Sequence, residues 1–289
     1  MPARLRRSLL YAPADQPNLL AKTARTNADA VTFDLEDTVA PANRPAAREH
    51  IREAMTDVDF GDTEVCVRVN GLGTDDWLAD LDAAVDAGCH AVRLPKVEAA
   101  WQLRTVAEVL DARGADDVEV LVTLETPRGF ERGTDIAETA ASLDSVTGLG
   151  YGLADYTTAI GAAGPDADGG RLRSGLARQA LSVAAIGDLD PIATVFTDVE
   201  DTDGLRAVAE DARELGFVGQ SVIHPRQVDV VNDVFTPDEE RVQRLRRLLA
   251  RYDESDRNSI SVEGEFLDEP IVERYRRQVA RYERVAGRD

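Results

Sequence analysis

Short apolar runs alternate along the chain with longer stretches in which apolar and polar residues recur at helical spacing. Most of the runs are almost continuously apolar, which is typical of parallel strands covered on both faces. Residues 204–216 exemplify the stretches between them, an amphipathic segment that ends at Gly216, a residue suited to a helix C-cap. The pattern predicts eight strands, which begin at Ser8, Ala30, Glu64, Ala91, Glu119, Ser145, Pro191 and Gln220.

Each predicted strand is followed by helical sequence, and all eight lie within residues 1–235. This alternation predicts the α/β class and a (β/α)8 TIM barrel. A doubly wound sheet is the competing fold, but it would be expected to carry a glycine-rich dinucleotide loop. The glycines of GLGYGL at 148–153 have the wrong spacing for that loop, so the barrel is favoured.

The alternation ends after the eighth strand, and residues 236–289 are interpreted as a C-terminal helical extension. A capping box with a proline at the first helical position is expected where its first helix begins, made by Thr236, Pro237 and Glu239. A hairpin around Gly264 and a last helix follow. The chain is therefore expected to have two parts, a catalytic barrel at 1–235 and a helix–hairpin–helix extension.

Acidic residues outnumber basic ones by 54 to 33, which gives a net charge of −21. This balance argues against nucleic acid as a partner, because phosphates need a basic surface. Only Lys22 and Lys96 are lysines, so the other 31 basic residues are arginines. An acidic, lysine-poor surface keeps a protein soluble in concentrated salt, and we favour a halophilic source over an acidic protein from a GC-rich mesophile.

No apolar run approaches the ~20 residues that span a bilayer, so no membrane partner is expected. The start of the chain superficially resembles a signal peptide, but its apolar run breaks at Pro13, short of the ~7–15 residues of an h-region. We interpret it as the first strand of a cytoplasmic protein. Cys66 and Cys89 are too few for a disulfide framework or a zinc site and are expected in the core.

Polar residues gather where the predicted strands end, which is where a barrel of this type carries its active site. Carboxylates outnumber cations there, and such crowding is costly unless a divalent metal joins the acids. Every candidate ligand is an oxygen, so Mg²⁺ is expected, held by Glu125 and Asp155, with Glu36 and Asp37 binding metal-bound waters. The strand-end residues are Asp34, Glu36, Asp37, Arg68, Asn70, Lys96, Glu125 and Asp155.

A structural interpretation competes with this one. Carboxylates at strand ends often cap the next helix, as Asp37 could, and Arg68 could merely pair with one of the acids. The metal interpretation is favoured because the acids occur together at one mouth of the barrel.

Several motifs in one order carry a resemblance to a known family, from about Arg7 to the final helix. They read RSLLYAPA, FDLEDTVAP, VRVNGLGT, RLPKVE, LETPRG, GLADYT, FTDVED and GFVGQSVIHP. Together they resemble the citrate lyase beta subunit family, the CitE-like branch of the HpcH/HpaI aldolases, which includes malyl-CoA, β-methylmalyl-CoA and citramalyl-CoA lyases. The resemblance implies a Mg²⁺-dependent (β/α)8 barrel that assembles as a homotrimer or hexamer.

The resemblance also implies roles for individual residues. Glu125 of the ETPRG motif and Asp155 of the GLAD motif would be the metal ligands, and Arg68 of the RVN motif would grip the substrate carboxylate or carbonyl. Tyr11 and Lys22 stand where acyl-CoA members contact their ligand. Lys96 also falls in a site segment and, with Glu125, is counted among the residues that bind substrate or CoA.

The family further has an acidic residue in a C-terminal segment that reaches a neighbouring subunit's site, and it falls on Asp268 of GEFLDEP. An aspartate just before a proline-led helix is also a good N-cap. With the resemblance, Asp268 is favoured as a catalytic acid or base.

The resemblance therefore implies a Mg²⁺-dependent carbon–carbon lyase. It would cleave a 3-hydroxyacyl-CoA reversibly into a 2-oxo acid, such as glyoxylate or pyruvate, and an acyl-CoA. Two alternatives stay open, a citrate lyase beta subunit acting on an acyl-carrier thioester, and a malyl-CoA thioesterase or malate synthase-type activity. An oxo-acid-binding barrel without catalysis is the non-enzymatic alternative.

Overall fold

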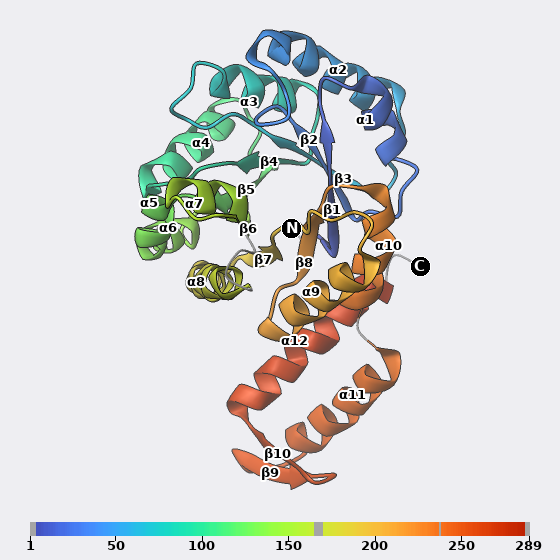
Figure 1. Ribbon diagram of the computed structural model, residues 1–289. Coiled ribbons are helices and arrows are strands. Elements are labelled where there is room, and N and C mark those ends of the chain that lie inside the picture. Colours follow the sequence, from blue (N-terminus) through green and yellow to red (C-terminus); the bar gives the residue numbers. More distant parts are fainter. Residues whose placement is uncertain (1–3, 165–169, 237, 287–289) are drawn as a thin grey trace. The chain divides into compact units, whose positions relative to one another are not determined.

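The computed structural model describes residues 4–164, 170–236 and 238–286 of the chain. Eight parallel strands pair in chain order, and β8 pairs back to β1, so that the barrel is closed (Figure 1). The strands are β1 (Ser8–Pro13), β2 (Ala30–Asp34), β3 (Glu64–Arg68), β4 (Ala91–Leu94), β5 (Glu119–Leu124), β6 (Val146–Tyr151), β7 (Asp190–Ala193) and β8 (Gly219–Val222). The (β/α)8 fold predicted from the apolar runs is confirmed.

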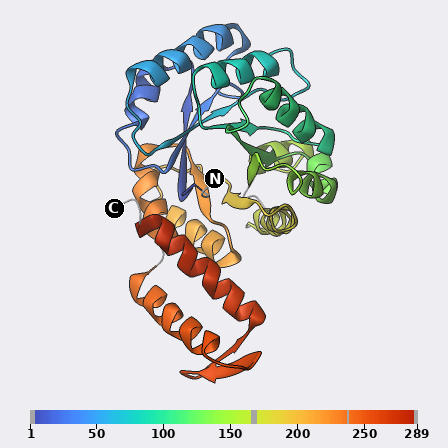
Figure 2. The same ribbon diagram turned by 180° about the vertical axis from the view of Figure 1, so that it is seen from behind.

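Helices follow the strands and lie around the outside of the barrel, as opposite views show (Figures 1 and 2). They are α1 (Pro17–Thr23), the 3-10 turn η1 (Pro41–Asn43), α2 (Arg44–Asp57), α3 (Trp77–Asp86), α4 (Ala100–Ala112), α5 (Pro127–Glu131), α6 (Gly133–Ala140), α7 (Leu153–Ala159), α8 (Arg171–Gly187), α9 (Thr202–Leu215) and α10 (Pro225–Phe235). The expected C-cap of α9 is confirmed, since Gly216 has a φ of 117°.

The inside of the barrel is layered. At the amino-terminal end Arg6 donates to Glu64 at 2.7 Å and to Glu119 at 2.6 Å, the first residues of β3 and β5. An apolar cluster above them takes one residue from each of six strands, namely Leu9, Ala30, Cys66, Ala91, Leu121 and Ile192. Because side chains alternate along a strand, the residues two positions further on face the same interior, nearer the carboxyl ends. Those positions are polar again.

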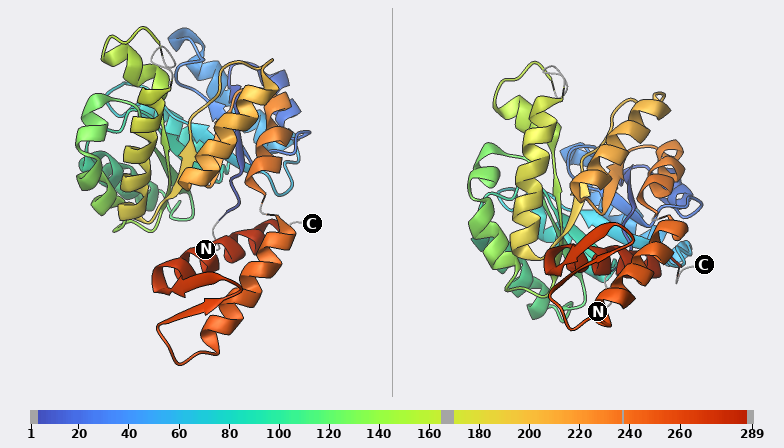
Figure 3. Two further views of the ribbon diagram at one scale, coloured as in Figure 1. Left: turned by 60° about the horizontal axis from the view of Figure 1, so that its bottom comes forward. Right: turned by 90° about the horizontal axis from the view of Figure 1, so that it is seen from below.

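Contacts divide the chain into two compact units, Arg6–Asn232 and a second made of Met1–Leu5 with Asp233–Asp289. In the second unit α11 (Glu239–Asp253) and α12 (Glu269–Ala286) lie side by side, and the antiparallel strands β9 (Ser259–Val262) and β10 (Glu265–Asp268) connect them (Figure 3). Glu263 and Gly264 turn the hairpin with φ angles of 52° and 79°, which confirms the hairpin expected around Gly264.

The capping expected at the start of α11 is wrong. The N-cap is Asp238, whose Oδ1 accepts from the backbone N–H of Glu240 at 3.0 Å. Glu239 is consequently the first residue of the helix and not the third, and Pro237 lies outside the described residues. Aspartate caps at least as well as Thr236 would, and the apolar face of the helix begins at Val242 in either case.

Both cysteines are buried, as expected. In the described part of the chain, no helix combines the length and the apolar character needed to cross a membrane.

Candidate active site

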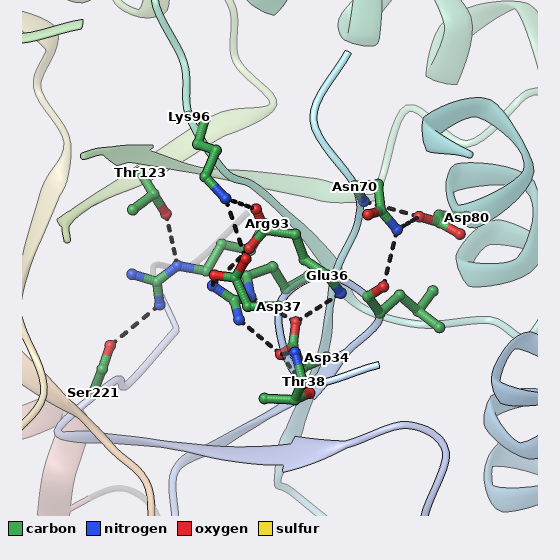
Figure 4. A network of polar contacts seen from close by, with 12 residues as sticks. Asp34, Glu36, Asp37, Thr38, Asn70, Asp80, Arg93, Lys96, Thr123 and Ser221 are labelled. Carbon is green, nitrogen blue, oxygen red and sulfur yellow. Dashed lines mark hydrogen bonds and ion pairs between the residues drawn. The ribbon is translucent and has the colours of Figure 1, made fainter. Parts of the chain in front are cut away.

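Asp34 and Arg68 lie opposite each other where β2 and β3 end. Arg68 donates from Nε to Oδ1 of Asp34 at 2.6 Å and from Nη2 to Oδ2 at 2.7 Å, and the Thr38 hydroxyl adds a bond of 2.6 Å (Figure 4 shows Asp34 and Thr38). Burial alone would raise the pKa of Asp34, but the bonds from Arg68 hold it below its ordinary value. Arg68 therefore does pair with one of the acids, as the structural interpretation expected. The carboxylate of Asp34 neutralises the charge of the Arg68 guanidinium.

Glu36 and Asp37 follow β2 and face Lys96 from across the mouth (Figure 4). Nζ of Lys96 donates to Oε1 of Glu36 and, at 3.2 Å, to Oδ1 of Asp37. Nη1 of Arg68 lies 2.9 Å from Oε2 of Glu36 without hydrogen-bond geometry, so this buried oxygen has no hydrogen-bond partner among the described residues. Burial raises the pKa of Glu36 to about 7.

Lys96 also contributes its backbone, which has a φ of 51° and donates from N–H to Oε1 of Glu125 at 2.8 Å. Such a φ is uncommon outside glycine and is typical of functional positions. The other oxygen of Glu125, Oε2, faces Gly152, the residue after β6, where an added Cβ would lie only 2.4 Å from it. Burial raises the pKa of Glu125, and the nearby carboxylate of Asp155 raises it further.

Asp155 stands in the first turn of α7, and its Oδ1 lies 3.8 Å from Nζ of Lys96. The side chain is 38% exposed, in contrast to Glu125, which is buried. The carboxylates expected to act at the mouth are thus brought together around Lys96. They are Glu36, Asp37, Glu125 and Asp155.

The carboxylates at the mouth can be compared with the ligands that Mg²⁺ requires. In the described residues no group of three or more acidic, histidine or cysteine side chains is arranged to hold a metal. Mg²⁺ does not need one, because it commonly takes one or two carboxylates and keeps water or substrate at its other positions. Glu125 and Asp155 fit that requirement, and Oε2 of Glu36, which accepts no hydrogen bond from the described residues, can accept one from a metal-bound water.

Two arginines lie against Tyr11 at the interior end of the cluster. The guanidinium of Arg68 is 5.1 Å from the ring centre and that of Arg93 is 5.5 Å from it. Arg93 was not among the expected site residues, because it stands within β4 and not after its end. A charged residue inside the apolar run AVRLPKV was the available signal.

Two other expected residues make no contact with the carboxylates around Lys96 among the described residues. Lys22 is exposed on α1, and no contact in the described part of the chain connects it to the mouth. Asp268 lies in the second unit, where its Oδ1 accepts from the backbone N–H of Ile271 at 3.3 Å. That bond is the helix cap considered as the alternative role of Asp268.

Residues 7–225 match the family model described as HpcH/HpaI aldolase/citrate lyase. Citrate lyase subunit beta of Leuconostoc mesenteroides subsp. cremoris is 32% identical over 284 residues, which cover 95% of this chain and 92% of that protein. The L-malyl-CoA/beta-methylmalyl-CoA lyase of Rhodobacter capsulatus is 32% identical over 272 residues, 86% of this chain and 85% of that protein. A (3S)-malyl-CoA thioesterase of Cereibacter sphaeroides is 31% identical over 285 residues, 97% and 96% of the two chains.

Among solved structures, the chain is similar to protein CitE from Mycobacterium tuberculosis in complex with magnesium, acetoacetate and coenzyme A. The TM-score is 0.79 at 29% sequence identity, and the match covers 96% of this chain and 98% of that one. The likeness therefore extends over the whole fold.

Proposed function

We propose that this chain, which belongs to the HpcH/HpaI aldolase/citrate lyase family, cleaves a 3-hydroxyacyl-CoA reversibly. The lyases among its relatives and the magnesium in the similar CitE structure support a Mg²⁺-dependent lyase. Malyl-CoA, β-methylmalyl-CoA and citramalyl-CoA are the candidate substrates. The products would be a 2-oxo acid, glyoxylate or pyruvate, and an acyl-CoA. The observation that carries the proposal is the grouping of Glu125 and Asp155 with further carboxylates at the mouth of this barrel.

In this proposal Glu125 and Asp155 hold Mg²⁺, and Glu36 and Asp37 accept hydrogen bonds from its water molecules. When bound, the ion would act as a Lewis acid that polarises the hydroxyl oxygen on the carbon whose C–C bond breaks, and it would orient the adjacent carboxylate. Arg68 stabilises the same developing oxo-acid oxygen from the side, and Asp34 fixes the position of its guanidinium.

Cleavage breaks the bond between the hydroxyl-bearing carbon and the carbon next to the thioester. The hydroxyl gives its proton to water and its O–H electron pair forms the carbonyl of the oxo acid, while the electron pair of the broken bond passes to the thioester enolate. We assign Asp268 to give the enolate carbon its proton, and to remove it in the reverse direction. Its place in the C-terminal unit fits a family in which this residue acts on a neighbouring subunit, and a homotrimer or hexamer is proposed on the same grounds.

Tyr11, Lys22 and Lys96 are proposed to contact the acyl-CoA. Tyr11 is supported by the guanidinium groups of Arg68 and Arg93 over its ring, and Lys96 by its ion pairs with the metal-site carboxylates. Lys22 is proposed from its motif position alone.

A second candidate is a citrate lyase beta subunit that acts on an acyl-carrier thioester, favoured by the relative from Leuconostoc. A malyl-CoA thioesterase is the third, favoured by the relative from Cereibacter. Hydrolysis would release free CoA thiol, which a thiol reagent detects, whereas lyase action alone would not.

The test is a panel of the three CoA thioesters and citryl-CoA, assayed for 2-oxo acid with and without EDTA. We expect Mg²⁺-dependent release of glyoxylate or pyruvate. Asp268→Asn should abolish turnover and leave Mg²⁺ and oxo-acid binding unchanged, with Asp256→Asn, an exposed aspartate of the same unit, as control. Full turnover in Asp268→Asn would rule out its catalytic role, and no oxo acid from any thioester would contradict the proposed function.

A further inference from the structure

Arg93 is a buried cation inside the barrel, and among the residues that the structure describes it has no acidic partner. It stands two residues after Ala91 of the apolar cluster and is 3% exposed. Its Nε donates to the Thr123 hydroxyl at 2.9 Å and its Nη1 to the Ser221 hydroxyl at 3.2 Å (Figure 4). No carboxylate of the described residues forms an ion pair or a hydrogen bond with it.

Two other arginines inside the barrel, unlike Arg93, are paired with carboxylates. Arg6 bonds to Glu64 and Glu119, and Arg68 bonds to Asp34 through two atoms. A guanidinium does not lose its charge in a protein, and an unpaired buried charge is strongly unfavourable. Two neutral hydroxyls satisfy hydrogen bonds but leave the charge of Arg93 uncompensated, which points to an anion that is not part of the chain.

The barrel wall is shaped to hold this guanidinium beside the metal-site carboxylates. A Cβ on Gly150 of β6 would lie 2.1 Å from Nη2 of Arg93, and a Cβ on Gly152 would lie 2.4 Å from Oε2 of Glu125. Gly152 directly follows β6 and its backbone is still extended, so it lies about 6.6 Å beyond Gly150, and Arg93 lies one layer below Glu125 on the inner face. A small acid bound at Glu125 from above would have Arg93 beneath it.

We propose that Arg93 contacts the substrate and receives a carboxylate of its 2-oxo-acid part. The proposal rests on the proposed function, since it names a ligand for the same site. The planar fork of a guanidinium matches a carboxylate, and Arg68 is less suited because Asp34 already occupies its fork. The carboxylate has two possible sources, the one next to the oxo group, present in every 2-oxo acid, and a second one, present in oxaloacetate.

The experiment is isothermal titration of the full chain with pyruvate and with freshly dissolved oxaloacetate, with Mg²⁺ present, together with the Tm of each variant. Arg93→Met should weaken oxo-acid binding about 10- to 100-fold. It should leave the Tm of the free protein equal or raise it, because an unpaired buried charge is removed. Arg104→Met is the matched control, since Arg104 also donates to a threonine hydroxyl, Thr139, but lies exposed on α4.

A similar loss for both acids supports the proposal and assigns Arg93 to the carboxylate next to the oxo group. A loss for oxaloacetate alone supports it and assigns Arg93 to a second carboxylate. Should Arg93→Met not fold, Gly150→Ala carries the test, because it keeps the charge and displaces the guanidinium, and the same losses are expected.

The proposal would be overturned if these variants bind both acids with unchanged affinity, whether or not their Tm is lowered. Arg93 would then have only a structural role, linking Thr123 and Ser221 by hydrogen bonds. Absence of binding by the unaltered protein would contradict the proposed function and this inference together.

Discussion

Asp34 has no exposed surface, and five hydrogen bonds reach its two oxygens, from Arg68, from the Thr38 hydroxyl and from the N–H groups of Glu36 and Thr38. Such a carboxylate stays ionised because the donors replace water and the guanidinium supplies the opposite charge. It orients Arg68 and shapes the loop that carries Glu36 at the same time. One buried residue thus sets the geometry of one side of the mouth.

Asp34→Asn should therefore lower the free energy of unfolding by about 1.5–3 kcal/mol at pH 7, because Arg68 loses the carboxylate bonded to two of its atoms and keeps only its ion pairs with Glu36 and Asp37. The pKa of Asp34 is lower in the folded state, so its stabilising effect is full above the unfolded pKa of about 3.9 and is lost as pH falls through the folded pKa. Urea denaturation at several pH values measures the difference between the two proteins.

Asp37→Asn is the matched control, since the Asp37 side chain is 48% exposed and its removal should change stability by no more than about 0.5 kcal/mol. A difference between wild type and Asp34→Asn that persists unchanged below pH 3 would contradict the role given to ionised Asp34.

Single residues also show where sequence reasoning succeeds and where it stops. Glu125 and Asp155 could be expected because they follow the ends of β5 and β6, and strand ends meet at one mouth in any barrel. That no described carboxylate pairs with Arg93 could not be expected. It depends on which side chains of β4, β5 and β8 converge inside the barrel, and only three-dimensional distances reveal that.

At the level of elements, the carboxyl ends of β5 and β6 form the part of the mouth on which the metal site depends. Glu125 follows β5, and Gly152 follows β6, with backbone N–H bonded to the carbonyl of Leu124 at 2.9 Å. The absence of a side chain at Gly152 leaves the space that Oε2 of Glu125 occupies.

Gly152→Ala is accordingly expected to push Glu125 aside and to weaken Mg²⁺ binding by about tenfold or more, as loss of a ligand-orienting contact does. Titration calorimetry with Mg²⁺ measures it. Gly175→Ala on α8 is the control, because a Cβ there meets nothing within 4 Å. Equal Mg²⁺ affinity in Gly152→Ala and wild type would argue against Glu125 as a ligand.

Elements were predictable to different degrees for a physical reason. Strands such as β2 are fully buried on both faces, and burial of that kind needs a continuous apolar run that is visible in the sequence. Helix starts depend on a local choice between neighbouring caps. Asp238 and Thr236 both suit the position, and the chain begins α11 after Asp238.

The molecule as a whole carries a net charge of −21, spread over a surface on which lysine is almost absent. Repulsion among exposed carboxylates opposes folding at low ionic strength, because the Debye length is about 10 Å at 0.1 M salt. At 1 M salt it falls to about 3 Å, so most of the repulsion is screened. Ion pairs on the surface are screened as well, but each contributes little.

The Tm should therefore rise as KCl is increased from about 0.1 M to about 1 M. K₂SO₄ at equal ionic strength separates screening from the general strengthening of apolar burial, since screening depends on ionic strength alone, while sulfate strengthens burial further. Changing the exposed Glu108, Glu210 and Glu214 to Gln should raise the Tm at low salt and flatten its salt dependence. A Tm that falls with KCl, or three substitutions that leave its slope unchanged, would show that carboxylate repulsion does not limit stability, and would remove the physical basis for interpreting this composition as an adaptation to salt.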